Sequence, residues 1–261
     1  MVTTPVNEAE SRRRGRSYRL LDGLLAALVV VLAFLAASFA VRNGDFWFHL
    51  ATGRLLAEKQ FTFGVDPFAY TTQGVYWTHH AWLFDRLLYA LYGWIGGAGL
   101  VLVKASLVAA LASLLTRLRR PHGSGWLPAA CTAFAVLAMS PRLLLQPACL
   151  SYVFFGLSFW LLARPHADEG AVPDNKHYLP LPLLFLLWVN VDEWFLLGPV
   201  LVVLFWVGER LGGLRRTPGW LVPVGLAACG CRFRPWSSSR SVPSRRHSVS
   251  RWASFVIPVG G

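Results

Sequence analysis

Seven residues of this chain carry side chains whose chemistry suits catalysis or ligand binding. The candidate catalytic acids are Asp45, Asp192 and Glu193, and the candidate substrate-binding residues are His49, His79, His80 and Arg142. Carboxylates and imidazoles are the groups that enzymes commonly use as general bases and acids. A guanidinium matches the oxygens of a phosphate in a bidentate manner. This set therefore predicts proton transfer beside a phosphorylated group.

Asp45 follows the first long apolar segment, residues 20–41, and precedes Phe46, Trp47 and Phe48. Aromatic residues such as tryptophan favour the interface between membrane and water. An acid fixed at that depth can act on the head group of a lipid-borne substrate, as a general base or as a ligand of a sugar or a divalent metal ion. The structural alternative is that Asp45 caps the helix that follows it, and the two roles are compatible.

Asp192 and Glu193 interrupt an otherwise apolar run. An acid at mid-membrane costs roughly 2.5 kcal/mol or more, so such residues normally face a cavity or a partner. The alternative is an ordinary turn between two spans. Arg142, in another turn predicted on the same side, is the expected counter-charge or phosphate ligand, and its alternative is an ordinary interfacial arginine.

His79 and His80 lie between two tryptophans at the start of a second amphipathic segment. Either one of the pair points into a site, or both belong to an aromatic-rich cap at the membrane interface. Neighbouring residues of a helix diverge, so the pair is not a metal-binding motif. His49 has the same two interpretations. Whether a divalent metal ion takes part stays open.

The composition is typical of a membrane protein. Of the 261 residues, 55% are hydrophobic and 15% are charged, whereas about a quarter of a soluble domain is charged. The net charge is +12, half of it from six arginines in the tail, 231–261. The other basic residues lie beside apolar segments, which indicates membrane topology and not nucleic-acid binding. The four cysteines lie in or beside apolar segments and predict neither a disulfide framework nor a zinc site.

The alternation of apolar segments with arginine clusters predicts an all-α, polytopic transmembrane helix bundle of about six to seven spans. Residues 1–19 contain five arginines and should stay cytoplasmic by the positive-inside rule, a cleaved signal peptide being the alternative. The transmembrane region covers 20–230, and its external loop, 42–93, carries amphipathic surface helices at 46–59 and 78–92. The expected spans are 20–41, 95–115, 127–139, 149–163, 179–189, 195–207 and 220–228.

Two segments of this topology are less regular. Residues 179–207 form either two half-spans around a cavity or one long helix with acids in its middle, which the arginines at 210, 215 and 216 argue against. The tail, 231–261, has six arginines and eight serines but no leucine. We interpret it as a frameshifted or wrongly assigned end, which makes the chain the truncated front part of a longer protein. Whether this truncated chain is active or inactive stays open. The alternative is a disordered basic tail on the membrane surface.

Five stretches of the sequence resemble a known class of bacterial membrane proteins. They are Asp45–Arg54 (DFWFHLATGR), Asp66–Thr71 (DPFAYT), Trp77–Leu83 (WTHHAWL), Leu187–Asn190 (LWVN) and Phe195–Gly198 (FLLG). The resemblance is to glycosyltransferases of the GT-C type, the class that includes protein mannosyltransferases and aminoarabinose transferases.

The resemblance implies an integral, multi-pass protein of the cytoplasmic (inner) membrane with its N-terminus inside. It also implies sugar transfer from a polyprenyl-phosphate-linked donor on the non-cytoplasmic face, with Asp45 as catalytic base or metal ligand. The lipid bilayer and the lipid-linked sugar are then the partners. Two other functions stay open: a transporter or flippase subunit with a mid-membrane site at residues 190–193, and a non-catalytic membrane scaffold.

Overall fold

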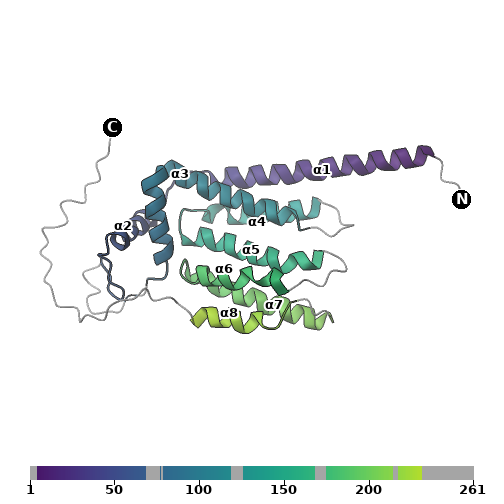
Figure 1. Ribbon diagram of the computed structural model, residues 1–261. Coiled ribbons are helices and arrows are strands. Elements are labelled where there is room, and N and C mark those ends of the chain that lie inside the picture. The colour runs from purple at the N-terminus through teal and green to yellow at the C-terminus, as the bar shows by residue number, and fades with distance from the viewer. Residues whose placement is uncertain are drawn as a thin grey trace, which may run out of the picture.

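Helices lying side by side make up the computed structural model, which describes residues 5–68, 77, 79–118, 126–167, 175–213 and 217–230 (Figure 1). Within these residues there is no strand, and an isolated antiparallel bridge joins Gly64 to Trp77. The basic tail predicted at 231–261 lies outside the described residues. The helices are α1 (Pro5–Ala37), α2 (Asp45–Ala57), α3 (Trp82–Thr116), α4 (Trp126–Met139), α5 (Pro147–Ala167), α6 (Pro180–Trp188), α7 (Leu197–Leu211) and α8 (Leu221–Gly230), with 3-10 turns η2 (Ser140–Arg142), η3 (Asn175–Tyr178) and η4 (Glu193–Leu196).

Four helices of the described residues are long and apolar enough to cross a membrane. The segments are Leu20–Ala37 in α1, Trp82–Thr116 (α3), Pro147–Arg164 in α5, and Glu193–Leu211, which consists of η4 and α7. Most of each segment is not buried inside the protein, so the apolar surface that remains suits contact with lipid. Helices α4, α6 and α8 have 14, 9 and 10 residues, fewer than the ~20 that a perpendicular crossing needs. The expected count of six to seven spans therefore stays a prediction.

The first apolar helix ends earlier than its sequence pattern indicates. Helix α1 stops at Ala37, four residues before the predicted end at 41. The Ser38 hydroxyl donates to the carbonyl oxygen of Phe34 at 2.6 Å, a local bond that competes with regular helix. Residues 38–44 then lead to α2. The helix predicted at 46–59 is confirmed, since α2 covers Asp45–Ala57.

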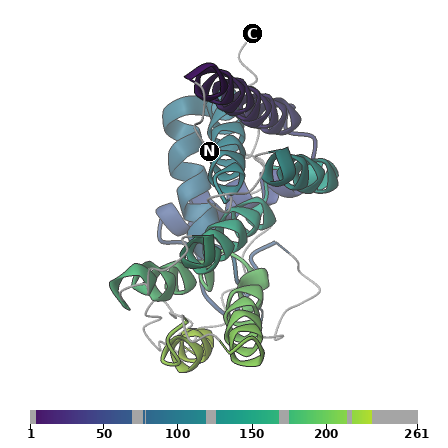
Figure 2. The same cartoon turned by 90° about the vertical axis from the view of Figure 1, so that its right-hand side faces the viewer.

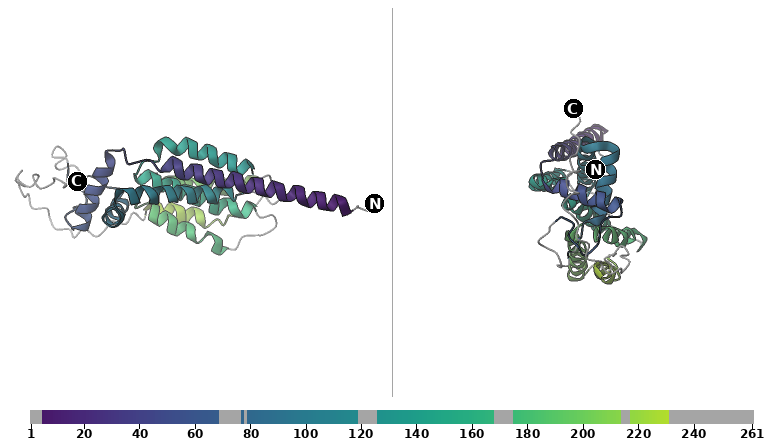
Figure 3. Two further views of the ribbon diagram at one scale, coloured as in Figure 1. Left: turned by 90° about the horizontal axis from the view of Figure 1, so that it is seen from above. Right: turned by 90° about the vertical axis from the view of Figure 1, so that its left-hand side faces the viewer.

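The helices predicted at 78–92 and 95–115 are two limbs of α3, joined by a kink at Gly96. Gly96 has φ +66° and ψ −175°, a conformation that only glycine adopts readily. The first limb lies across one end of the bundle beside α2, and the second runs along the bundle (Figures 1 and 3). In the end-on view of Figure 2, α1, α3 and α4 form one half of the bundle and α6, α7 and α8 the other, with α5 between them.

The chain reverses direction between α6 and α7, which excludes a single long helix over 179–207. The amide of Asn190 donates to the Leu186 carbonyl at 2.8 Å at the end of α6. The Asp192 carboxylate accepts from the backbone N–H of Glu193 and caps η4. The break predicted at Asp192 and Glu193 is therefore confirmed, and it is a turn at the end of the bundle that carries α2 (Figure 1).

A hydrophobic cluster at the α2 end fixes these separate segments together. It joins α2, the first limb of α3, the turn before α5 and the turn after α6 through the buried residues Phe46, Ala81, Phe84, Leu88, Leu100, Leu145 and Val191. The two other clusters lie along the bundle. The α2 end is therefore where polar residues far apart in the sequence are brought close.

Candidate functional site

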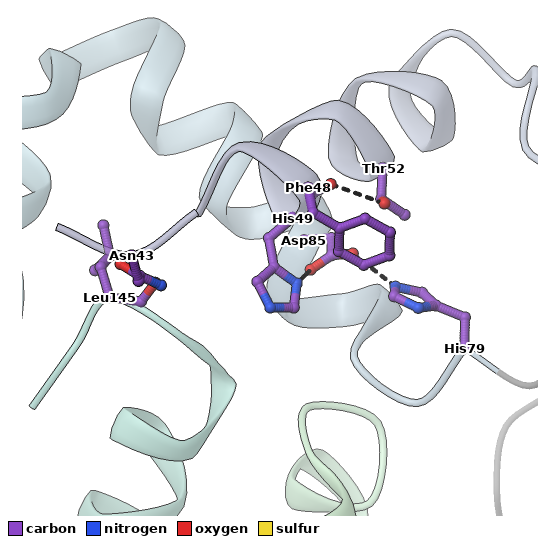
Figure 4. Close-up of polar contacts among 7 residues, drawn as sticks. All are labelled: Asn43, Phe48, His49, Thr52, His79, Asp85 and Leu145. Carbon is purple, nitrogen blue, oxygen red and sulfur yellow. Dashed lines mark hydrogen bonds and ion pairs between the residues drawn. The ribbon is translucent and has the colours of Figure 1, made fainter. Parts of the chain in front are cut away.

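Asp85, in the first turn of α3, is fully buried and is bonded by two histidines. Its Oδ1 lies 2.7 Å from Nδ1 of His49, and its Oδ2 lies 2.6 Å from Nε2 of His79 (Figure 4). An ionised carboxylate only accepts hydrogen bonds, so each of these ring nitrogens carries a hydrogen. The geometry thus leaves Nε2 of His49 and Nδ1 of His79 without a bond to Asp85. We call these three residues the Asp85 cluster.

The close approach of α2 to α3 creates the cluster. Gly53 follows His49 by one helical turn and packs on the backbone of α3, where a Cβ atom would lie 2.1 Å from the carbonyl oxygen of Asp85. Phe46 and Thr52 are buried on the same helix. Only a residue without a side chain allows the two helices to come this close, and this distance lets the His49 ring reach Asp85.

Aromatic rings hold His79 in place. Its ring stacks on Trp77 with centroids 4.9 Å apart and planes 25° apart, and the Trp77 amide donates to the carbonyl of Gly64 at 3.1 Å. The Phe61 ring lies 5.7 Å away. Of the two histidines proposed from the sequence, His79 bonds the cluster, whereas the half-buried His80 does not bond Asp85.

Asp192 reaches the same region from the turn after α6. It is 7% exposed, and it accepts hydrogen bonds from the Ser151 hydroxyl at 2.5 Å and from the Glu193 amide at 2.9 Å. The pKa of Asp192 is raised, chiefly by burial and to a smaller extent by the charge of Glu193. The hydrogen bonds from Ser151 and from the Glu193 amide, and the ring of His49, act in the opposite direction and lower the pKa.

The turn that carries Asp192 is fastened to the start of α3. The indole N–H of Trp82 donates to the side-chain oxygen of Asn190 at 3.2 Å. The backbone N–H of Leu83 donates to the carbonyl of Asn190 at 3.2 Å. Asp85 follows two residues later, so these bonds set the position of Asp192 relative to the Asp85 cluster.

The three other predicted residues are exposed. Asp45 is the first residue of α2, where its charge favours the helix dipole; Gly44 and not Asp45 holds the capping position. Residues four apart share a helix face, so Asp45 lies on the side of α2 that carries His49. Glu193 begins η4, and Arg142 ends η2.

Arg142 is not the counter-charge that the sequence suggested for the acids. Among the described residues, the hydrogen-bond partners of Asp192 are the neutral Ser151 hydroxyl and a backbone amide, and no ion pair joins Arg142 to Asp192 or Glu193. The physical reason is local. Ser151 is on α5 beside the turn, and a short neutral bond satisfies the carboxylate without bringing a second charge into a buried site.

Sequence reasoning did not identify Asp85 or Lys104. Lys104 is 2% exposed within the apolar part of α3, donates to the Leu143 carbonyl at 2.8 Å and lies 3.9 Å from the Phe39 ring centroid. It thereby ties the end of α1 to the turn before α5. Lys104 is a lone charge in an apolar stretch, and that signal could have drawn attention to it. Asp85 is followed directly by Arg86 and gives no such signal.

No three histidine, cysteine or acidic side chains converge in metal-binding geometry within the described part of the chain. Both oxygens of Asp85 are engaged by imidazoles. The arrangement is suited to proton transfer, because a carboxylate behind an imidazole fixes the ring's tautomer and stabilises its protonated form.

Comparison of the chain with protein-family models, with curated proteins and with solved structures finds no match.

Proposed function

We propose that this chain is a multi-pass membrane glycosyltransferase-like protein that transfers a sugar from a polyprenyl-phosphate-linked donor on the non-cytoplasmic face. The observation that carries the proposal is the buried Asp85 cluster, with Asp192 close to it, at one end of a bundle of apolar helices. Such a cluster can move a proton at the depth where a lipid head group lies. The resemblance of Asp45–Arg54 to GT-C enzymes supplies the substrate class.

In this proposal Nε2 of His49 takes the proton from the hydroxyl group of the acceptor. The acceptor oxygen then bonds to the anomeric carbon of the sugar. The bond from that carbon to the phosphate oxygen breaks, and its electron pair leaves with polyprenyl phosphate. The carboxylate of Asp85 accepts the hydrogen bond from Nδ1 of His49 and stabilises the imidazolium that forms.

The exposed residues receive the remaining roles. Asp45, on the His49 side of α2, orients the acceptor at the water side of the cluster. Arg142 lies in the turn before α5, three residues before Leu145 of the hydrophobic cluster that joins α2 to α3. Its guanidinium binds the leaving phosphate.

The orientation follows from charge and aromatic residues. The arginine-rich start of α1 lies at the end of the bundle opposite α2 (Figure 1), and basic flanks favour the cytoplasmic side. Trp47 and Trp94 are 52% and 84% exposed at the α2 end, as expected of tryptophans at the membrane interface. Helix α2 and the first limb of α3 therefore face the non-cytoplasmic side of the cytoplasmic membrane.

The test uses the purified chain in lipid nanodiscs with a set of polyprenyl-phosphate-linked sugars, and measures the polyprenyl phosphate released. His49→Gln and Asp85→Asn should each lower the rate by about 100-fold or more, since a general base contributes roughly 10²–10⁴. His177→Gln is the matched control, because His177 bonds the Leu161 carbonyl away from the site. Wild-type rates in both site variants would exclude His49 and Asp85 from the reaction, and no release from any donor by the wild-type chain would overturn the proposed function.

A further inference from the structure

A directed chain of hydrogen bonds ends at Asp192. The indole N–H of Trp188 donates to the Ser151 hydroxyl at 2.8 Å, and that hydroxyl donates to Oδ2 of Asp192 at 2.5 Å. Trp188 is fully buried, Ser151 is 4% exposed and Asp192 is 7% exposed. Water therefore has little access to these bonds, and the protein itself fixes their direction.

The chemistry of the donors leaves one arrangement of hydrogens. An indole nitrogen can only donate, so it occupies a lone pair of the Ser151 oxygen. The single hydrogen of the hydroxyl is then directed to Asp192. Oδ1 of Asp192 accepts from the Glu193 amide at 2.9 Å. Both oxygens of Asp192 thus receive a hydrogen bond, and hydrogen bonds of this kind favour the ionised carboxylate.

We propose that Trp188 and Ser151 are positioning residues that hold Asp192 as an oriented, ionised carboxylate in the turn fastened to the start of α3. The inference rests on the proposed function and deepens it, because the turn that carries Asp192 is fastened to the start of α3, which holds Asp85. Its physical content is separate from sugar transfer, since it concerns the charge and orientation of one carboxyl group.

Opposing influences act on this carboxyl group. Burial raises the pKa of Asp192, and the Ser151 hydrogen bond is the first of the influences that lower it. The titratable groups that act on Asp192 are Glu193, its neighbour, which raises the pKa, and His49 of α2, which lowers it. His49 is itself bonded to Asp85 of α3. Without the hydroxyl of Ser151, one of the hydrogen bonds that lower the pKa of Asp192 is lost. Asp192 should then keep its proton to a higher pH.

Helix α5 provides a matched control. Ser158 lies two turns after Ser151 on the same helix, is fully buried, and its hydroxyl has no hydrogen-bond partner. Ser158→Ala removes a buried hydroxyl of the same kind without touching Asp192. Ser151→Thr keeps a hydroxyl at position 151 and serves as the conservative variant. Trp188→Phe removes the indole donor and keeps an aromatic ring.

The experiment follows the ionisation of Asp192 by NMR of the full chain in nanodiscs with ¹³C-labelled aspartate carboxyl groups. The Asp192 signal is assigned as the one that disappears in Asp192→Asn. In Ser151→Ala the titration midpoint of this signal should move up by about one pH unit or more, since hydrogen bonds to charged groups contribute roughly 1.5–3 kcal/mol. Trp188→Phe should move it in the same direction by less. Ser151→Thr and Ser158→Ala should leave it unchanged.

An unchanged midpoint in Ser151→Ala, or an equal shift in Ser158→Ala, would overturn the proposal. If Ser151→Ala does not fold, Trp188→Phe supplies the decisive measurement. The assay of sugar transfer is independent of this result. If the midpoint shifts but the chain transfers no sugar, the proposed function is refuted and the positioning role of Ser151 stands. If the chain transfers sugar but the midpoint does not shift, the positioning role is refuted and the proposed function stands.

Discussion

Gly53 of α2 contacts the backbone of Asp85 on α3, and this contact sets the distance between the two helices. A Cβ atom at position 53 would lie 2.1 Å from the carbonyl oxygen of Asp85 and 2.8 Å from the Cβ atom of Tyr89. Neither neighbour is the end of a flexible side chain, so the helices themselves must move apart. His49 is one turn away on the same face of α2 and bonds the side chain of Asp85 at 2.7 Å.

Gly53→Ala should therefore separate α2 from α3 and break the bond between His49 and Asp85. We expect a loss of about 1–3 kcal/mol in unfolding free energy, the usual cost of overpacking, measured by thermal or denaturant unfolding in detergent micelles. Gly93→Ala is the control, because a Cβ at Gly93 meets nothing within 4 Å. Equal stability of the two variants would contradict the importance of this contact.

Gly96 should be equally intolerant, for a conformational reason. Its φ of +66° and ψ of −175° lie in a region almost closed to other residues, at a cost of roughly 1–3 kcal/mol. Gly96→Ala should favour a straighter α3, move the first limb away from α2 and weaken both imidazole bonds to Asp85. The ring-nitrogen NMR signals of His49 and His79 should then change together. Gly97→Ala, at an adjacent glycine whose φ is not positive and whose Cβ would make only an ordinary 3.9 Å contact with the Tyr92 ring, should leave these signals as they are.

The local patterns of the sequence predicted the helices well. The amphipathic pattern at 46–59 and the acids at 192–193 are each set by neighbours in sequence, and α2 and the turn after α6 follow them. The position of the kink in α3 was harder to predict from the sequence. The stretch 93–99 contains several glycines, and only packing of the first limb across the bundle selects Gly96 as the residue with positive φ.

The partners within the site were not predictable from the same patterns. Asp85 bonds His49 because α2 approaches α3 at Gly53, a contact between segments 32 residues apart in the numbering. Ser151 bonds Asp192, although a serine in an apolar helix gives no signal of its own. Arg142 was predicted as the counter-charge from its charge and from its turn on the same side of the membrane, but the neutral hydroxyl of Ser151 bonds Asp192 instead.

The raised pKa of Asp192 predicts how stability depends on pH. Burial is the largest cause of the shift, so in the folded state the carboxyl keeps its proton at a pH where the unfolded chain has lost it. Below the ordinary aspartate pKa both states are protonated and this contribution is fully present. It is lost as pH rises from there through the pKa of the folded state. The wild-type chain should therefore lose stability over this range relative to Asp192→Asn, measured as the difference between their unfolding free energies at each pH. A difference that stays constant, or that grows in favour of wild type with rising pH, would contradict the shift.

The site requires that its residues share one side of the membrane, and labelling of single cysteines tests this. Asp45, Arg142 and Glu193 are exposed at the α2 end, whereas Arg117 and Arg210 are exposed at the ends of α3 and α7 that lead away from it. In a chain whose native cysteines are replaced, Asp45→Cys, Arg142→Cys and Glu193→Cys should react with an impermeant maleimide added to right-side-out vesicles. Arg117→Cys and Arg210→Cys should react in inverted vesicles only. Asp192 and His79 are too buried to serve as reporters, with 7% of the residue and 6% of the side chain exposed. Labelling of positions 45 and 193 from opposite sides would separate His49 from Asp192, and no single head group could then reach both.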